Sequence, residues 1–324
     1  MWHINLVIKT RIMLTQSIVA AMNSKSFTIL LFLSVCLIWG TTWFAMEIAL
    51  HSIPPVFATG MRFLLAAPLL VVMAKLFKQP LLFPKGKRRW ILIVAVMYFA
   101  FPFTLMIYGE QYISSGLASI IFANMPVAVM VMSGIFLGLR LAKHQTFGLV
   151  IAVVSLCLIL GNEMKLGGEN YLLGTLSLGL AVLMHSVMYV FVQKFCKDVP
   201  VLTYNAIPCF IASLLLFALS GFLEPIDIAS FTSESVYAVV YLGLVASVGG
   251  IVAYFKLGQV STPFQASICF LIFPLVALLL CAYVNDEVLS TQSILLMLPL
   301  MFGILLTKTP KTVFQRRPKA VIAD

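Results

Sequence analysis

Residues 111–126 read QYISSGLASIIFANMP, and residues 259–274 read QVSTPFQASICFLIFP. Aligned from Gln111 and Gln259, the two stretches agree at six of sixteen positions, and each ends in a proline, Pro126 or Pro274. The stretches lie 148 residues apart in a chain of 324 residues. Self-similarity at this long period indicates that the chain is built from two related halves.

Ten long apolar segments surround these stretches, five in each half. Most of them match the ~20 residues that a helix needs to cross the core of a bilayer. Because five is an odd number, the second half enters the membrane from the opposite side, as in the inverted repeats of secondary transporters. The sequence therefore predicts an all-α integral membrane protein with ten transmembrane helices, built as two inverted five-helix repeats. The segments cover approximately residues 28–49, 55–74, 90–109, 114–138, 145–161, 172–192, 202–220, 236–257, 262–281 and 290–307.

The positive charge between the segments falls almost entirely on one side of the membrane. If all ten segments cross, 19 of the 21 Lys and Arg residues lie on the side that holds both termini. Lys165 faces the other side, and Arg62 lies within a segment. Since cytoplasmic loops carry the excess of Lys and Arg, both termini are predicted to be cytoplasmic.

The composition excludes several classes of protein. The chain is 62% hydrophobic and 10% charged, with a mean hydropathy of +1.08, and it leaves no room for a sizeable soluble domain. We interpret the net charge of +10 as a topology signal with attraction to anionic lipid, not as a sign of nucleic-acid binding. The cysteines and histidines show no metal-ligand or catalytic spacing, and the sequence has no GxxxxGKS/T phosphate loop. We therefore expect a small-molecule substrate and the lipid bilayer as partners, no nucleic acid, no cofactor or metal, and no enzymatic activity; the oligomeric state stays open.

Four regions follow from this plan. Residues 1–27 form a cytoplasmic N-terminal segment, residues 28–161 the first repeat, residues 172–307 the second repeat, and residues 308–324 a basic cytoplasmic tail. The stretch before Met22 fits either an upstream extension or an amphipathic helix at the membrane interface.

Arg62 is the sharpest candidate for a binding residue. It lies about seven residues into the second segment, where a charged side chain needs a partner or a water-filled cavity. Its guanidinium is suited to bind a carboxylate or other anionic group of a substrate through two parallel hydrogen bonds. The alternatives are a structural pair with Glu47 or a side chain that extends to the membrane interface.

Two tryptophans share one face of the first segment. Trp39 and Trp43 are four residues apart, and Trp39 lies near the middle of the segment. With Thr42, they are predicted to line a pocket for an aromatic or apolar group. The alternative is close helix packing at Gly40.

The sixth segment carries a histidine, His185, near its middle. An offset of 146 sets Trp39 against His185 and Trp43 against Tyr189. A histidine at this depth serves as a proton relay, as a substrate contact, or as an ordinary hydrogen bond between helices. His185 and Tyr189 are therefore both candidate binding residues.

Further polar side chains lie in apolar surroundings. Asn124 in the fourth segment and Gln265 in the ninth serve either as pocket lining or as hydrogen-bonding links between helices. Tyr98 and Tyr254 are candidate pocket hydroxyls.

Prolines within the segments are candidate hinges. Proline removes a backbone donor and kinks a helix. Because Pro126 and Pro274 occupy matching places in the two halves, we predict hinges there.

The carboxylates lie away from the middle of the segments. Glu47, Glu110 and Glu287 are all near outer ends. This position argues against tight proton coupling through a buried carboxylate, and it leaves facilitated diffusion, exchange or coupling through His185 open.

The sequence resembles the EamA-type transporters of the drug/metabolite transporter superfamily over roughly residues 28–307. The resemblance rests on LIWGTTWFAMEIAL at 37–50, FATGMRFLLAA at 57–67, and the longer stretches 108–141 and 253–290. The family's repeat usually ends its fourth and ninth helices with Gly-Glu. Here Leu139 replaces that glutamate in the first copy, and Glu287 retains it in the second.

The resemblance and the repeat together imply a carrier in the cell inner membrane that works by alternating access. The resemblance also implies export or exchange of small metabolites, with amino acids prominent among them. A membrane-embedded enzyme and a non-transporting partner subunit are the alternative functions.

Overall fold

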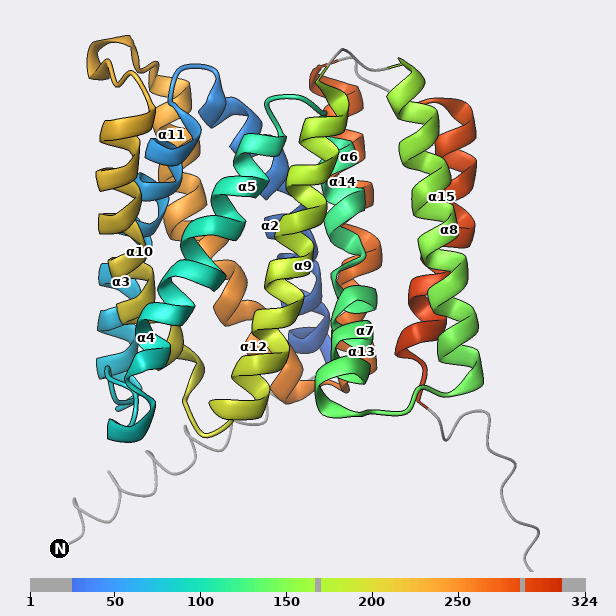
Figure 1. Ribbon diagram of the computed structural model, residues 1–324, viewed down its shortest axis with the longest axis horizontal. Helices are drawn as coiled ribbons and strands as arrows, with labels where there is room; N and C mark the ends of the chain where they lie inside the picture. Colours follow the sequence, from blue (N-terminus) through green and yellow to red (C-terminus); the bar gives the residue numbers. More distant parts are fainter. Residues whose placement is uncertain (1–24, 167–169, 286–288, 311–324) are drawn as a thin grey trace, which may run out of the picture.

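The computed structural model describes residues 25–166, 170–285 and 289–310 (Figure 1). Within these ranges, ten helical runs are long and apolar enough to cross a membrane, which confirms the predicted all-α class and the count of spans. The first half contains α2 (Lys25–Leu50), α3 (Pro55–Leu76), α4 (Arg89–Val94), η2 (Ala95–Ala100), α5 (Phe101–Gly109), α6 (Ser115–Ala123), α7 (Met125–Leu137) and α8 (Lys143–Leu166). The second half contains α9 (Tyr171–Phe195), α10 (Val201–Leu223), α11 (Ser233–Tyr241), η4 (Leu242–Gly249), α12 (Gly250–Val260), α13 (Pro263–Ser267), α14 (Cys269–Val284) and α15 (Thr291–Lys308).

Local sequence signals start and end several of these helices. Ser114, Thr232 and Ser290 precede α6, α11 and α15, and each side-chain oxygen accepts a hydrogen bond from the backbone N–H three residues on. Such caps satisfy N–H groups at the start of a helix and contribute about 1 kcal/mol each. Gly138 ends α7 with φ of 66°, a left-handed conformation that favours glycine.

Two spans carry a π-helical segment at equivalent places in the two halves. When the two halves are aligned with an offset of 148 residues, η2 matches residues 243–248, which lie inside η4. In the first half the cause is local, because Pro102 has no N–H to donate to the Tyr98 carbonyl and the hydrogen-bond ladder before it is shifted. The matched segments are a structural counterpart of the sequence repeat. Single π turns inside α-helices are frequent at functional sites.

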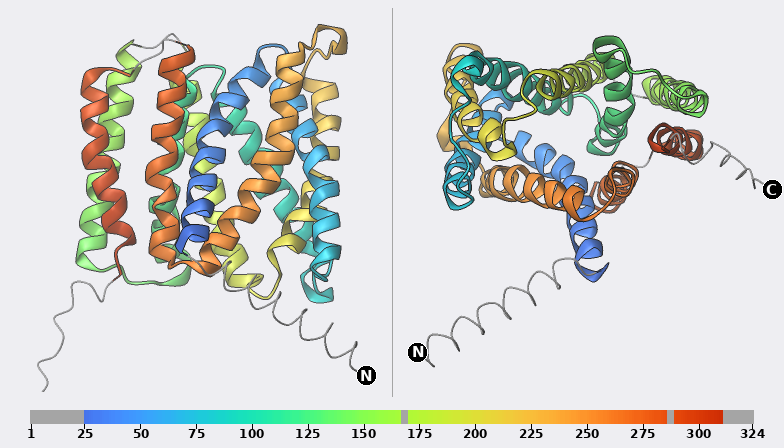
Figure 2. Two further views of the ribbon diagram at one scale, coloured as in Figure 1. Left: turned by 180° about the vertical axis from the view of Figure 1, so that it is seen from behind. Right: turned by 90° about the horizontal axis from the view of Figure 1, so that it is seen from below.

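The helices form two rows when the molecule is seen from below (Figure 2). One row contains α5, α9 and α7, and the other contains α12, α2 and α14. At one edge, α8 and α15 pack against each other (Figures 1 and 2). A Cβ added to Gly148 would lie 2.7 Å from the Gly303 carbonyl oxygen, so the two backbones approach closely at this crossing. Small residues allow such approaches between membrane helices.

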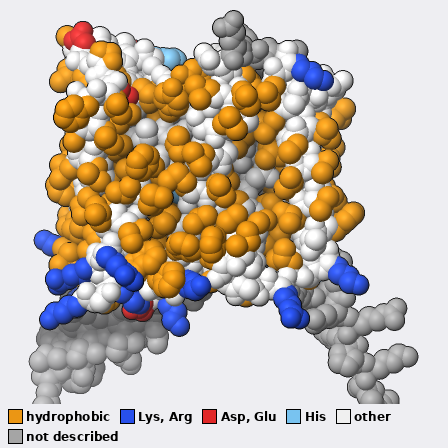
Figure 3. Space-filling view, in the orientation of Figure 1, with side chains coloured by type: hydrophobic (Ala, Val, Ile, Leu, Met, Phe, Trp, Pro, Cys, Tyr) orange, Lys and Arg blue, Asp and Glu red, His pale blue; other side chains and the backbone are white. Residues whose placement is uncertain are grey.

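Charged side chains distinguish the two ends of the bundle. Lys and Arg side chains gather at the end where α2 begins at Lys25 and α15 ends at Lys308, which we call the basic end (Figure 3). Between the ends, hydrophobic side chains cover the surface, as expected for contact with lipid (Figure 3). We call the opposite end the acidic end; its carboxyl groups include those of Glu47, Glu110, Glu163 and Glu224.

The predicted hinges lie in different settings. Pro126 is in the first turn of α7, just after a break at Asn124 that separates α6 from α7. Pro274 lies inside α14, and the break in that span comes earlier, at Ile268. Motion at these prolines stays a prediction. The predictions for residues 1–21 and for Glu287 fall outside the described residues.

Candidate functional site

A cavity of about 240 Å³ lies between the two rows of helices. It has room for about eight water molecules at liquid density. The cavity extends from Trp43, Arg62 and Met106, in the half of the bundle toward the acidic end, to Tyr204 and Lys308 at the basic end. Eight of the ten predicted binding residues line it: Trp39, Thr42, Trp43, Arg62, Tyr98, His185, Tyr189 and Tyr254.

Arg62 lies at the end of the cavity nearest the acidic end, with 6% of its surface exposed. Its Nε–H donates to Ser247 Oγ (2.8 Å), and its Nη1 donates to the Met46 sulfur (3.5 Å). Its Cζ lies 4.9 Å from the centroid of the Phe103 ring, a favourable cation–π geometry. A guanidinium has five N–H donors, so these two hydrogen bonds leave donors for a ligand in the cavity.

The alternative pairing of Arg62 with Glu47 is not formed. In the described part of the chain, the one ion pair joins Lys87 to Asp198 at the basic end. Glu47 instead accepts a hydrogen bond from Asn285 Nδ2, which connects the ends of α2 and α14. Arg62 therefore faces the cavity with no carboxylate in contact.

A continuous run of ring contacts connects Arg62 to Trp43. The rings of Phe103 and His185 are 5.1 Å apart and nearly perpendicular. His185 lies 5.7 Å from Phe122, which in turn lies 5.3 Å from Trp43. The two pairs that include His185 are edge-to-face and the Trp43–Phe122 pair is tilted, so aromatic rings form one wall of the cavity. The cavity thus combines one fixed positive group with aromatic surfaces.

His185 is buried and connects two spans. Its Nδ1–H donates to the Ala181 carbonyl in the preceding turn (3.1 Å), so this tautomer is favoured. The ring also interacts with the backbone carbonyl of Tyr98 on the neighbouring span. This contact is the hydrogen-bonding link between helices that the sequence allowed as an alternative, and the same ring lines the cavity.

The first span uses different faces for packing and for the cavity. Trp39 lines the cavity, with its ring 4.8 Å from Tyr254 and 5.4 Å from Phe270. Gly40 faces α14, where an added Cβ would lie 2.5 Å from the Cβ of Val276. The two alternatives for this segment therefore both apply: Trp39 lines the cavity, and Gly40 allows close packing against α14.

Two of the predicted binding residues do not line the cavity. Asn124 is buried at the break between α6 and α7, and its Nδ2 donates to the Ile120 carbonyl (3.0 Å). Gln265 is exposed and forms a capping box with Thr262 at the start of α13. Because its side chain turns back onto its own helix start, Gln265 is held away from the cavity.

The sequence analysis missed several lining residues. Phe122 and Phe270 both line the cavity and occupy matching places in the repeat, at an offset of 148. Phe99 and Ser247 form a second such pair, one in each π-helical segment. The alignment of the two halves could have indicated these lining positions, whereas a search for polar residues could not find the phenylalanines.

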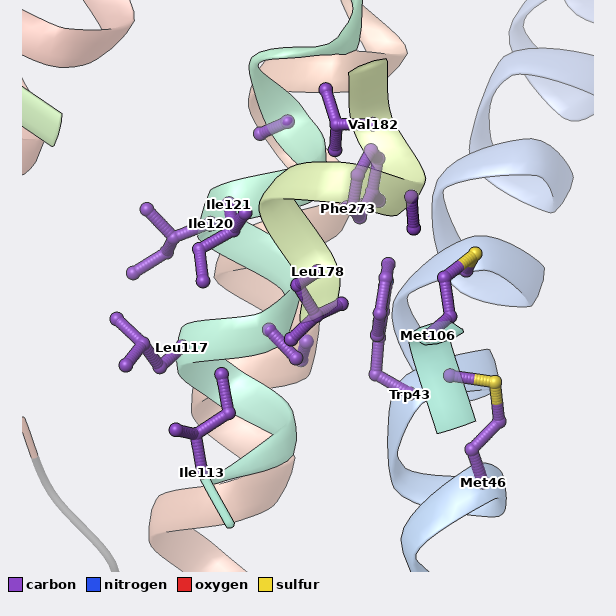
Figure 4. Close-up of a cluster of buried hydrophobic side chains, with 14 of the residues drawn as sticks. Trp43, Met46, Met106, Ile113, Leu117, Ile120, Ile121, Leu178, Val182 and Phe273 are labelled. Carbon is purple, nitrogen blue, oxygen red and sulfur yellow. The ribbon is translucent and has the colours of Figure 1, made fainter. Parts of the chain in front are cut away.

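Apolar packing closes the cavity toward the acidic end. Trp43, Met46 and Met106 meet between α2 and α5 and are each at most 4% exposed (Figure 4). Beyond them, the backbone N–H groups of residues 56 and 57 donate to the Glu224 carboxyl oxygens (2.7 and 2.9 Å), which joins the ends of α3 and α10. The residues that line the cavity continue toward the basic end as far as Lys308.

Glu110 has a different environment from the other acidic-end carboxyl groups. It follows the last turn of α5, is 6% exposed, and neither carboxyl oxygen has a hydrogen-bond partner within the described ranges. Burial raises the pKa of Glu110 well above its ordinary value. The nearby Glu47 raises this pKa further, and Arg62 lowers it.

Glu110 lies at the outer end of its segment, as the sequence indicated, but it is buried there, so a position near a segment end does not exclude a buried carboxylate. The reason lies in packing: a Cβ added to Gly109 would lie 3.0 Å from the Gly174 carbonyl oxygen. Because the end of α5 meets α9 so closely, a residue at the end of its span is buried.

Comparison with known proteins agrees with this architecture. The profile of the EamA-like transporter family matches residues 26–161 and 172–309, once in each half. Protein PagO of Salmonella typhimurium is 48% identical over 278 residues, which cover 86% of this chain and 91% of that protein. An uncharacterized transporter of Buchnera aphidicola subsp. Schizaphis graminum is 43% identical over 90% of this chain and 97% of that protein. The uncharacterized inner membrane transporter YedA of Escherichia coli K12 is 27% identical over 87% of this chain and 90% of that protein.

A solved crystal structure shows the same fold, with a TM-score of 0.63 at 18% identity over 88% of this chain and 97% of that chain. Ten spans, a duplicated family match and the similarity to proteins named as transporters define a multi-pass membrane transporter. The chain belongs to the EamA-like transporter family.

Proposed function

We propose that this protein is a secondary transporter that exports or exchanges small organic anions with an aromatic or apolar body. Amino acids, which the family resemblance favours, are zwitterions that carry the same carboxylate group and would bind Arg62 through it. The observation that carries the proposal is the buried Arg62 guanidinium, which faces an aromatic cavity with donors to spare. A guanidinium binds a carboxylate through two parallel hydrogen bonds, a geometry that lysine does not reproduce.

The charges that line the cavity favour an anion. Among the described lining residues, the charged ones are Arg62 and Lys308, and both are positive. A second cavity adjoins the first at Pro126 and Lys308, and Arg140 lines it at the basic end. An anion that arrives from the basic end therefore meets positive side chains before it reaches Arg62. Clefts lined by one sign of charge concentrate ligands of the opposite sign.

The charge distribution also supports an orientation. Since cytoplasmic ends carry the excess of Lys and Arg, the basic end and both termini lie in the cytoplasm. The inner membrane is the location, as the name of the relative YedA says of that protein. In this orientation the cavity reaches toward the cytoplasm and is closed on the opposite side, an inward-open conformation.

The repeat supports alternating access. Inverted repeats exchange conformations around a site near the midplane. Tyr98 in η2 and Ser247 in η4 line the cavity from matched π-helical segments, one in each half. When one end opens and the other closes, each half then adopts the conformation that the other half had before.

Metabolite profiling tests the proposal. Cells that overproduce the protein are compared with vector controls for compounds in the medium, with and without a proton uncoupler. We expect one class of anionic compound to accumulate, and we expect Arg62→Lys to reduce its excretion. Arg88→Lys, in an exposed loop at the basic end, is the matched control and should excrete at the wild-type rate.

Two results contradict the proposal. The first is excretion of cationic compounds that depends on the protein. The second is wild-type excretion by Arg62→Lys at equal membrane levels. A non-transporting partner subunit would show no excreted compound and would tolerate substitution at Arg62.

A further inference from the structure

The acidic end holds buried carboxyl groups in two kinds of setting. Glu163 accepts hydrogen bonds from the Ser290 N–H (3.1 Å) and hydroxyl (2.7 Å), and Glu224 accepts three. Glu110 is exposed to a similar extent as Glu163, 6% against 8%, and yet neither of its oxygens accepts a hydrogen bond from a described residue. Glu110 and Glu163 therefore differ in their donors, not in their burial.

An ionised carboxylate without donors is very costly to bury. A group in that position binds a proton and becomes neutral. The neutral carboxylic acid still lacks a partner, but the cost of an unpaired dipole is far smaller than that of an unpaired charge. Burial of Glu110 is thus compatible with the protonated form.

Two charged groups lie within electrostatic range of Glu110. Glu47, from α2, disfavours a negative charge on it, and Arg62, from α3, favours one. Arg62 is not in ion-pair contact with Glu110, since the described residues form one ion pair elsewhere. Arg62 lines the cavity, and Glu110, outside that lining, lies within electrostatic range of Arg62 and of Glu47.

The other elements packed against α5 direct their titratable groups elsewhere. On α9, Tyr171 interacts with a carboxyl group of α8, and His185 contacts the ring of Tyr98 in η2 at 5.1 Å. In the loop that contains Glu110, the Tyr112 hydroxyl donates to the Tyr108 hydroxyl (3.1 Å). Glu47 and Arg62 are thus the groups that set the charge around Glu110.

We propose that Glu110 is a proton-binding site whose protonation keeps the acidic end closed and leaves the charge of Arg62 available to an anion. The step is one proton exchange with water. In the closed conformation Glu110 is a carboxylic acid; when the acidic end opens, its O–H bond breaks, the proton passes to water on that side, and the carboxylate keeps the electron pair.

A consequence for transport rests on the proposed function. While Glu110 is neutral, it adds no negative charge near Arg62, and the guanidinium attracts the anionic substrate. Once Glu110 is ionised, its carboxylate offsets that charge and competes with the anion. Protonation of Glu110 and anion binding therefore strengthen each other by the same factor.

The sign of the pH dependence follows from linkage. The closed conformation holds the pKa of Glu110 above its ordinary value, and exposure to water in the open conformation restores that value. Below the ordinary value both conformations are protonated, so pH has no effect on their ratio. Above it the open conformation alone loses its proton, and the equilibrium shifts toward open by up to about tenfold per pH unit until the closed-state pKa is passed.

Infrared spectroscopy of the purified full-length protein in lipid tests the protonation directly. A protonated carboxyl group has a C=O stretch that a carboxylate lacks. We expect a carboxylic acid band at neutral pH that is lost in Glu110→Gln and kept in Glu163→Gln, a carboxyl of similar burial with donors. The same band in wild-type protein and in Glu110→Gln would overturn the proposal.

Cysteine labelling in proteoliposomes tests the effect on closure. Ala49, in α2 near the acidic end and 0% exposed, is replaced by cysteine after removal of the exposed Cys157. Labelling by a membrane-impermeant maleimide is measured from the acidic side from about pH 5 to about pH 8, above the ordinary carboxyl pKa. Each rate is divided by that of a Ser230→Cys protein, whose exposed site corrects for the pH dependence of thiol chemistry.

Relative labelling at position 49 should rise with pH in otherwise wild-type protein. It should stay low at every pH when Glu110→Gln is added, because glutamine imitates the neutral acid. A flat profile without Glu110→Gln, or the same rise with it, would overturn the role in closure. Neither measurement needs a substrate, so failure here leaves the proposed function standing, and failure of the proposed function leaves this site standing.

Discussion

The Arg62 guanidinium lies against the ring of Phe103, with its Cζ 4.9 Å from the ring centroid. The ring comes from α5 and the guanidinium from α3, while Ser247 of η4 holds the Nε–H on the other side. Three spans thus fix the orientation of one charged side chain at the closed end of the cavity. A planar guanidinium fixed in this way presents its remaining donors as a pair.

Arg62→Lys should reduce transport by about tenfold or more. Lysine keeps the positive charge but loses the paired donors, and a charge-assisted hydrogen bond contributes about 1.5–3 kcal/mol. Initial rates of transport, measured at equal amounts of protein in the membrane, check this outcome. Equal rates in the two proteins would exclude a paired contact with the substrate.

Trp39→Ala should weaken binding of substrates with an aromatic body, and Trp39→Phe should retain most of it. The Trp39 ring lies 4.8 Å from Tyr254 and 5.4 Å from Phe270, and aromatic pairs contribute about 0.5–1.5 kcal/mol each. Competition between aromatic and aliphatic anions for transport gives the measurement. If alanine leaves the preference for aromatic anions unchanged, the tryptophan serves packing alone.

Gly40→Ala should destabilise the protein by about 1–3 kcal/mol, the usual cost of overpacking. An added Cβ at this position would lie 2.5 Å from the Cβ of Val276. Thermal unfolding in detergent measures the effect, and Val276→Ala in the same protein should restore part of the loss, because it removes the Cγ1 atom that would lie 2.6 Å from the added Cβ. Gly179→Ala, where an added Cβ meets nothing within 4 Å, is the control and should leave the unfolding temperature nearly unchanged.

The affinity for the transported anion should fall as the pH rises through the raised pKa of Glu110. Below that value Glu110 is neutral and adds no negative charge near Arg62; above it the new carboxylate offsets the charge of Arg62. Binding to purified protein over a pH series that rises from about 5, above the ordinary carboxyl pKa, measures the slope. Glu110→Gln should bind at every pH with the affinity that wild-type protein shows at low pH, and an unchanged slope in this variant would count against the coupling.

The sequence predicted most of the fold because a bilayer imposes length and hydropathy on each span. It also placed most of the binding residues, since polar and aromatic side chains at mid-depth, such as Trp39 and His185, face the interior where water or partners are found. The repeat aligned Phe122 with Phe270, although neither residue stood out by its type.

Tertiary packing decided what the sequence did not predict. Gln265 was predicted to line the pocket or to link helices, but at the start of the ninth span it caps the short helix α13 and is exposed. Glu110 was placed near an outer end, and the contact between Gly109 and Gly174 buries it there. Both residues lie at span ends, where hydropathy gives a boundary and the neighbouring helices determine the exposure.

Exchange across proteoliposomes tests the central claim most directly, that the Arg62 cavity binds an anion and opens to the two sides in turn. The compound excreted by overproducing cells is supplied outside in labelled form, with the unlabelled compound either present or left out inside. The account predicts faster uptake of label when the unlabelled anion is inside, and loss of this exchange in Arg62→Lys. Uptake that is independent of internal anion and equal in the two proteins would contradict it.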